Sequence, residues 1–264
     1  MIEDRKLDHI AICLRDKVES RVSSGFDDII PVHRCLPETD LDEIDLSVPF
    51  FGKTLAAPIV IAGMTGGAKK AKHINENLAV AAQELGVAMG LGSQRAGIEK
   101  PGLAHTYSIA REAAPDAFLI GNLGAVQFAA GYGYAQANAA VDMIKANAIA
   151  VHLNPLQEAV QPEGDRDFRG CVEAIKGLKE LSVPIIGKET GAGVSREDAR
   201  LLEKAGAAGV DVGGLGGTSF SAVESYREGV DRMLAERFWD WGIPTALSTI
   251  EVVENTGLTV ISTG

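Results

Sequence analysis

The run AIAVHLN at residues 148–154 sets the pattern from which the fold can be predicted. It is short and mostly apolar, it ends in the polar side chains His152 and Asn154, and it follows an amphipathic stretch at 134–146. Six more apolar runs share its character, at 58–64, 87–93, 117–123, 184–188, 209–213 and 258–262. Helical patterns follow most of the runs, at 71–85, 134–146, 166–181 and 196–205. Continuous apolar strands between helices predict a parallel sheet that is covered on both faces.

Polar residues whose side chains can take part in binding or catalysis come repeatedly just after these runs, at the carboxyl ends of the predicted strands. That edge is the active face of a TIM (β/α)8 barrel, and a length of 264 residues is ordinary for such a barrel. The sequence therefore predicts an α/β protein of the TIM (β/α)8 class.

Only seven strands can be counted, and just Thr263 and Gly264 follow the seventh run. We expect the eighth strand and the last helices to be absent from this chain. The alternative is that the N-terminal 57 residues supply the missing strand, although the polar stretch 40–48 is more typical of a flanking strand. The predicted division is an N-terminal segment at 1–57 and a barrel at 58–264, incomplete at its C-terminus. Residues 218–242, which include Trp239 and Trp241, are long for a βα loop and are expected to form an insertion over the barrel mouth.

Composition excludes several classes of function. A net charge of -11 argues against a nucleic-acid binder or a membrane-surface binder, but a local cationic cluster could still hold a small anion. No apolar run approaches the roughly 18 residues of a membrane span, and the charged N-terminus does not resemble a secretory signal. Cys13, Cys35 and Cys171 show no metal-ligand spacing and are expected to be reduced, mostly buried thiols of a cytoplasmic protein.

The stretch HLNPLQE at 152–158 holds the strongest chemical signal. Strand alternation places His152 and Asn154 on one face, and Gln157 and Glu158 follow at the strand end. The carboxylate of Glu158 suits Mg2+, which prefers carboxylate and phosphate oxygens. A single histidine at a strand end is more often structural, but an imidazole, two amides and a carboxylate together favour a functional site.

Other candidates are ambiguous when the residues are taken alone. Arg5, Lys6 and His9 are typical of a solvated tail, and Arg95 could be a surface residue. Lys188 ends an apolar strand, so it needs a partner, either Glu189 or another barrel carboxylate. The glycine-rich residues 213–217 are only a weak signal of a phosphate loop.

Together these motifs resemble the type 2, FMN-dependent isopentenyl-diphosphate delta-isomerases. HLNxxQE at 152–158 and QPEGD at 161–165 are similar to the signature of that family. Agreement extends to RKxDH at 5–9, GMTGG at 63–67, GSQR at 92–95, NLGA at 122–125 and GVDVGGxGGT at 209–218. The motifs follow the order of the family along essentially the whole chain. Asp8 stands where many relatives carry Glu.

The resemblance implies an FMN-linked barrel whose N-terminal segment folds over the active site. It implies that the diphosphate substrate is bound by Arg5, Lys6, His9, Ser93, Gln94, Arg95, Asn154 and Gln157. It also implies that the flavin is bound by Gly63, Met64, Thr65, Ser93, Asn122, Lys188 and Thr218. The family cradles the FMN phosphate in loops after the seventh and eighth strands, and residues 262–264 only enter the first of them. Flavin binding by this chain is therefore in question.

The implied reaction interconverts isopentenyl and dimethylallyl diphosphate in isoprenoid biosynthesis. The implied cofactors are FMN reduced by NADPH, and Mg2+ held by Glu158; Gln157 and His152 are the implied catalytic residues. A homo-oligomer, tetrameric or octameric, is also implied. One competing interpretation is an FMN-dependent barrel oxidoreductase, but no histidine follows His152 and Cys171 lies in a predicted helix. Another is an inactive fragment.

Overall fold

The computed structural model describes the backbone of residues 2–264 and the side chains of residues 6–264. Seven parallel strands form one sheet in chain order: β3 (Val60–Ile61), β4 (Ala88–Gly90), β5 (Phe118–Gly124), β6 (Ala148–Leu153), β7 (Ile185–Glu189), β8 (Gly209–Asp211) and β9 (Thr259–Ile261). Every neighbouring pair is parallel. Each strand lies within one predicted apolar run or within a residue of it. The predicted α/β barrel architecture is confirmed.

Alternation along β6 separates the inside of the barrel from the outside. Ala148 and Ala150 belong to an interior cluster that includes Phe118, Ile186 and Ile261 from other strands. Ile149 and Val151 belong instead to the larger cluster beneath the helices. His152 continues the inward alternation at the carboxyl end of the strand, so its ring reaches the mouth of the barrel.

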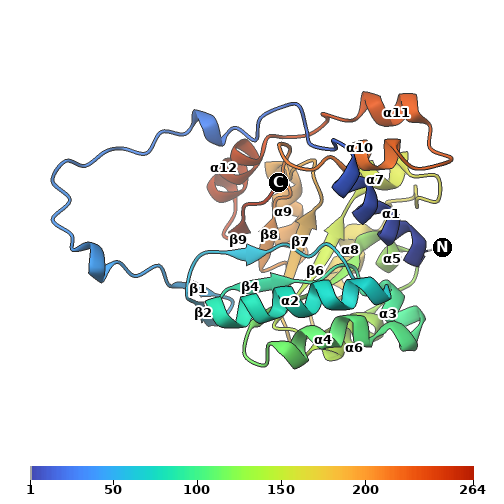
Figure 1. Ribbon diagram of the computed structural model, residues 1–264, viewed down its shortest axis with the longest axis horizontal. Coiled ribbons are helices and arrows are strands. Elements are labelled where there is room, and N and C mark those ends of the chain that lie inside the picture. Colours follow the sequence, from blue (N-terminus) through green and yellow to red (C-terminus); the bar gives the residue numbers. More distant parts are fainter. Residues whose placement is uncertain (1) are drawn as a thin grey trace.

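Helices cover the outer face of the sheet (Figure 1). The longer ones are α2 (Lys69–Leu85), α4 (His105–Ala113), α6 (Tyr134–Ile144), α9 (Arg196–Lys204) and α12 (Thr245–Asn255). Short helices follow several strands: α3 (Arg95–Glu99), η3 (Pro101–Leu103), α5 (Ala125–Ala129), α7 (Pro155–Val160) and α8 (Cys171–Lys176). The predicted helices at 71–85, 134–146 and 196–205 are confirmed to within two residues.

The predicted helix at 166–181 is wrong in extent, because only α8 forms within it. Gly170 precedes α8 with a φ of 84°, a left-handed conformation that an uninterrupted helix cannot contain. Gly177 follows its last residue. The layer outside β6 and β7 is therefore thinner than the apolar pattern predicts.

The sheet ends at β3 and β9, and no eighth strand joins them within residues 2–264. The N-terminal segment does not supply one. Its two strands, β1 (Val48–Phe50) and β2 (Lys53–Leu55), form a separate antiparallel hairpin whose Phe50 packs 4.8 Å from Phe118 inside the barrel. The predicted flanking strand at 40–48 is also wrong, since that stretch contains the short helix η2 (Leu41–Glu43) and only its last residue is extended in β1.

The rest of the N-terminal segment forms a helix that lies on the body and an arm that extends away from it (Figure 1). Helix α1 (Ile2–Arg15) packs against α10 (Phe220–Ser225), which belongs to the predicted insertion together with α11 (Arg232–Arg237). Trp239 of that insertion donates its indole N–H to Glu19 O at 3.0 Å. Residues 26–47, with η1 (Phe26–Asp28), then leave the body as a long arm (Figure 1).

The expectation that the cysteines are mostly buried is wrong. Cys13 and Cys35 are exposed and Cys171 is partly exposed, and all three are free thiols. Within the part of the chain that the structure describes, no helix is both long enough and apolar enough to cross a membrane.

Candidate active site

A polar cavity of about 290 Å³ lies at the carboxyl ends of the strands, beneath α1 and α10. Most of the residues predicted to form the site line it: Lys6, His9, Gly63, Met64, Ser93, Arg95, Asn122, His152, Asn154, Gln157, Glu158, Lys188 and Thr218. Residues from six βα connections and from the N-terminal helix thus meet at one place. The barrel brings them together because the carboxyl ends of parallel strands share one edge.

Two predicted residues are not among those lining the cavity. Gln94 is fully buried: its Nε2 donates to Ala140 O at 2.8 Å and its Oε1 accepts from Asn122 N at 2.9 Å. It therefore ties α6 to β5 beneath the site. Thr65 is buried, and its hydroxyl has no hydrogen-bond partner within the described side chains. The side chain of Arg5 lies outside the described residues.

His152 and Asn122 form the floor of the cavity on adjacent strands. Their side chains lie 2.7 Å apart, between His152 Nδ1 and Asn122 Oδ1. An amide oxygen can only accept, so His152 Nδ1 carries the hydrogen of this bond. The bond fixes both the tautomer and the orientation of the imidazole.

Lys188 is paired in the way that its place at a strand end requires. Its Nζ lies 2.7 Å from Asp211 Oδ2, and the two side chains are only 12% and 8% exposed. The hydroxyl of Thr263 donates to the other Asp211 oxygen. Of the two partners that the sequence allows, the structure therefore selects a barrel carboxylate rather than Glu189.

Glu189 has a different role, which the sequence did not indicate. One carboxylate oxygen, Oε2, accepts the backbone N–H groups of Thr190, Gly191, Ala192 and Gly193 at 2.6, 2.7, 2.5 and 3.1 Å. Burial nevertheless dominates and raises the pKa of Glu189 to about 7, against the lowering effect of these four donors. The carboxyl group holds the loop after β7 in a tight curve at the cavity wall.

Glu158 is held by neighbours on both oxygens. Oε1 accepts from Asn154 Nδ2 at 3.0 Å, and Oε2 accepts from Gln161 Nε2 at 2.5 Å and from the backbone N–H of Asp165 at 2.9 Å. Asn154 Oδ1 beside it is buried and has no hydrogen-bond partner in the described residues. No cluster of three or more metal-ligating His, Cys, Asp or Glu side chains occurs in the described chain.

Lys6 fastens α1 to the barrel. Its Nζ donates to Gly66 O at 2.6 Å, to Ser93 O at 3.0 Å and to the hydroxyl of Tyr107 at 3.2 Å. Tyr107 itself donates to Ser93 O at 2.7 Å, and burial raises its pKa. Lys6 thus joins the N-terminal helix to the loops after β3 and β4.

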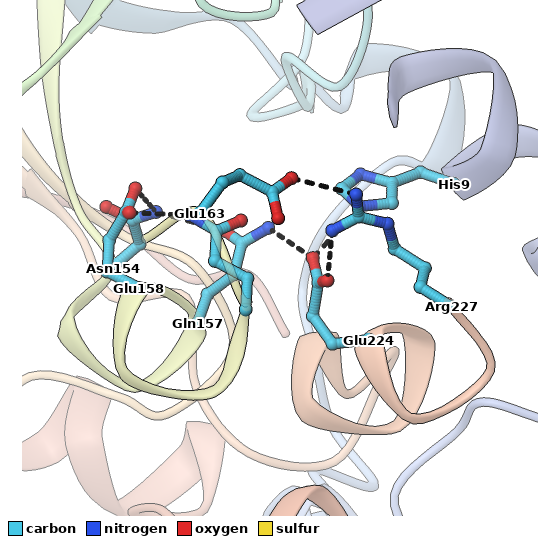
Figure 2. A network of polar contacts seen from close by, with 8 residues as sticks. His9, Asn154, Gln157, Glu158, Glu163, Glu224 and Arg227 are labelled. Carbon is cyan, nitrogen blue, oxygen red and sulfur yellow. Dashed lines mark hydrogen bonds and ion pairs between the residues drawn. The ribbon is translucent and has the colours of Figure 1, made fainter. Parts of the chain in front are cut away.

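A second set of contacts fastens α1 to the insertion, and Figure 2 shows it beside the Glu158 group. Glu224 is fully buried and lies 3.0 Å from His9 Nε2 and 2.6 Å from Arg227 Nη1. Arg227 also reaches Glu163 at 2.8 Å, and Gln157 Nε2 donates to Glu224 at 3.4 Å. The network therefore runs from the N-terminal helix, through α10, to the loop after β6.

Electrostatics fix the state of Glu224. Burial by itself would raise its pKa, but the hydrogen bond and charge of His9 and those of Arg227 together lower it below the ordinary value. Because the ionised carboxylate can only accept, His9 Nε2 must carry the hydrogen of their contact. Glu224 thereby orients His9 toward the cavity that both His9 and Gln157 line.

Sequence reasoning missed Glu163, Glu189, Glu224 and Arg227 as parts of the site. The available signal for Glu224 and Arg227 was their spacing of three residues within an insertion predicted to cover the barrel mouth. Glu189 was noticed only as a partner for Lys188.

The chain is similar to curated proteins from archaea. It is 52% identical over 265 residues to an isopentenyl-diphosphate delta-isomerase from Methanothermobacter thermautotrophicus, covering 100% of this chain and 74% of the relative. It is 54% identical over 270 residues to the protein of that name from Thermococcus onnurineus, covering 98% of this chain and 72% of the relative. No protein-family model matches.

Among solved structures, a mandelate oxidase variant with a monooxide FMN adduct matches with a TM-score of 0.46 and 15% identity, covering 97% of this chain and 83% of that one. Identity of half or more to the archaeal relatives, over nearly the whole chain, agrees with the motif resemblance at the strand ends. This chain belongs to the isopentenyl-diphosphate delta-isomerase family.

Proposed function

We propose that the chain interconverts isopentenyl diphosphate and dimethylallyl diphosphate in isoprenoid biosynthesis, using reduced FMN and Mg2+, with NADPH as the reductant. The observation that carries the proposal is the convergence of His9, His152, Asn154, Gln157 and Glu158 on one cavity at the barrel mouth. These residues come from two motifs far apart in the sequence, and both motifs resemble the family signature. The cytoplasmic location and the homo-oligomer belong to the same proposal and rest on the resemblance.

The chemistry of the cavity floor fits a flavin. Gly63 and Met64 present backbone at the end of β3, while Asn122 and Lys188 supply a polar amide and a cation from β5 and β7. Thr218 also lines the cavity, at the end of the glycine-rich turn after β8. A bound reduced flavin would supply an electron-rich acid–base group beside the reacting carbons. Lys188, held by Asp211, would place a positive charge at the ring.

The Glu158 group fits a divalent cation shared with a diphosphate. Glu158 supplies a carboxylate, and the oxygen Asn154 Oδ1 is buried without a partner in the described residues. Mg2+ is usually bound by one or two carboxylates together with phosphate oxygens and water, so a site with few acidic ligands is consistent with it.

The chain's own residues divide the remaining work. Arg95 and His9 line the cavity with positive or hydrogen-donating groups for the diphosphate. Gln157 lies between Asn154 and Glu224, at 3.0 and 3.4 Å, so its amide is held in place to orient the hydrocarbon end of the substrate. Helix α1 and the insertion cover the cavity and limit the access of water.

The test is an anaerobic assay with isopentenyl diphosphate, FMN, NADPH and Mg2+, followed by detection of the dimethylallyl isomer. Product formation that disappears with EDTA and is absent without flavin is the expected result. A protein that binds FMN but oxidises hydroxy acids instead would establish the oxidoreductase alternative. A protein that stays colourless with FMN and forms no isomer would establish the inactive fragment.

A further inference from the structure

A large apolar cavity of about 760 Å³ lies next to the polar one, on the outer side of β6 and β7. Its walls come from α5, α8, α9 and the segment after α11, with Val172, Leu201, Leu202 and Trp241 among the lining side chains. Val172, Leu201 and Trp241 remain 40%, 45% and 62% exposed, respectively. The short helix α8 leaves this space open, because it ends where a longer helix would have continued. Cavities of this size and polarity are typical small-molecule sites.

The two cavities share the lining residues His152, Asn154 and Glu189, and a small pocket, here called the passage, borders both. This small pocket of about 10 Å³ is lined by Gln157, Thr190 and Phe220, which also line the polar cavity. The same pocket is lined by Leu156 and Trp241, which also line the apolar cavity. Glu189 borders all three spaces. The passage now has room for about one water molecule, so a chain entering it must displace the Trp241 or Phe220 side chain.

The polar and apolar cavities differ in their lining side chains, and this difference indicates which class of ligand fits both. The polar side offers Arg95, His9 and the Glu158 group. The apolar side offers mostly aliphatic and aromatic walls; no Lys or Arg is among its described lining residues, and the charged side chains there are the acids Glu189, Asp198 and Asp240. We propose that the apolar cavity binds the hydrocarbon tail of a prenyl diphosphate longer than the five-carbon substrate, whose diphosphate occupies the polar cavity. The inference rests on the proposed function, since it uses the same diphosphate site.

A ligand bound in this way would exclude the five-carbon substrate. Longer prenyl diphosphates would therefore act as competitive inhibitors, and their affinity would rise with chain length because each added methylene leaves water. The reaction class connected with this site is the chain elongation that consumes the five-carbon product and yields longer diphosphates of the same chemistry.

The test measures binding of farnesyl diphosphate, isopentenyl diphosphate and inorganic diphosphate by calorimetry, in the presence of Mg2+. We expect farnesyl diphosphate to bind at least tenfold more tightly than inorganic diphosphate. Leu201→Asp and Val172→Asp should weaken the binding of farnesyl diphosphate at least fivefold and leave the affinity for inorganic diphosphate unchanged. Val253→Asp is the matched control, because Val253 is 58% exposed on α12 and is not among the residues lining the apolar cavity.

Several outcomes would overturn the tail site. One is equal affinity for farnesyl diphosphate and inorganic diphosphate; another is an equal loss in the Val253→Asp control. A third is that Leu201→Asp changes the molecular mass in solution but not the farnesyl diphosphate affinity, which would make this face an interface between copies of the chain. Isomerisation is assayed separately, so a protein that turns over but shows no preference for the long chain contradicts the tail site alone. A protein that neither turns over nor binds inorganic diphosphate contradicts the proposed function as well.

Discussion

Glu189 is a buried acid whose environment favours the neutral form. Its pKa is raised by burial from 4.5 to about 7, so between these values the folded state retains a proton that the unfolded chain has released. The free energy of unfolding must then fall as the pH rises from 4.5 to about 7, and stay level above that. At about 1.4 kcal/mol per pKa unit, the loss is about 3 kcal/mol.

Glu189→Gln removes this titration, since the amide stays neutral at every pH. We expect the difference in unfolding free energy between the wild type and Glu189→Gln to change by about 3 kcal/mol between pH 4.5 and 8, measured by urea denaturation. Glu180→Gln, at an exposed position, is the control and should give a nearly constant difference. A constant difference for Glu189→Gln as well would contradict the raised pKa.

Lys188 and Asp211 form a nearly buried pair, so removing one partner leaves the other charge without compensation. Lys188→Met should lower the free energy of unfolding by about 3 kcal/mol, and Lys188→Met with Asp211→Asn should recover most of this loss. Both variants should lose isomerase activity if Lys188 acts on the flavin. A double variant that regains activity together with stability would show that the lysine matters only for the fold.

At the residue scale, the part of the site carried by one continuous stretch could be predicted, and the part made by distant contacts could not. His152, Asn154, Gln157 and Glu158 follow one strand, so their meeting is dictated by local geometry. The contact between His9 and Glu224 joins residues 215 positions apart, and nothing in the local pattern of either helix indicates it. Gln94 shows the opposite case. Its motif predicts a substrate-binding residue, but its side chain is buried beneath the site and does not line the cavity.

At the element scale, helix α1 depends on its fastening at Lys6. Lys6→Met removes donations to Gly66, Ser93 and Tyr107, and hydrogen bonds from a charged donor contribute about 1.5 kcal/mol or more. We expect amide hydrogen exchange in α1 to accelerate at least tenfold, and the KM for isopentenyl diphosphate to rise more than kcat falls. Lys17→Met, at an exposed residue after the helix, should change neither. Unaltered exchange in the Lys6 variant would refute the fastening.

Strands were more predictable than helices because the barrel buries them on both faces. The runs at 117–123 and 148–154 are almost wholly apolar, and β5 and β6 occupy nearly all of both. The stretch 166–181 has a helical apolar pattern, but the left-handed Gly170 stops a helix from running through from 166, and α8 is six residues long. The left-handed backbone at Gly170 thus decided where an element begins that side-chain periodicity described incorrectly.

At the scale of the whole molecule, two features expose apolar surface. The sheet has edges at β3 and β9 in the described chain, and the arm at 26–47 carries Ile30, Val32 and Leu36 at 86%, 89% and 78% exposure. The apolar pattern could not predict the arm, because Ile30, Val32 and Leu36 are side chains of the kind that usually lie in a core. The arm follows from the tertiary structure. Strand β1 packs into one end of the barrel and α1 covers the other end, so the chain between them must run outside the body (Figure 1).

The arm should therefore be the first part of the chain to be cut by a protease. No backbone–backbone hydrogen bond involving residues 30–39 occurs in the described structure, whereas Arg111 in α4 donates to several carbonyls, Ile144 O and Ala117 O among them. A protease cuts where the backbone can leave its surroundings at little free-energy cost. Limited trypsin digestion followed by mass spectrometry should show the first cut after Arg34, at least tenfold faster than any cut after Arg111. Arg34→Gln should slow that cut without changing the unfolding midpoint. If the first cut instead fell within the barrel helices, the arm would have to be covered in solution, by a second copy or another polypeptide, and the exposed apolar side chains at 30–36 would be its contact surface.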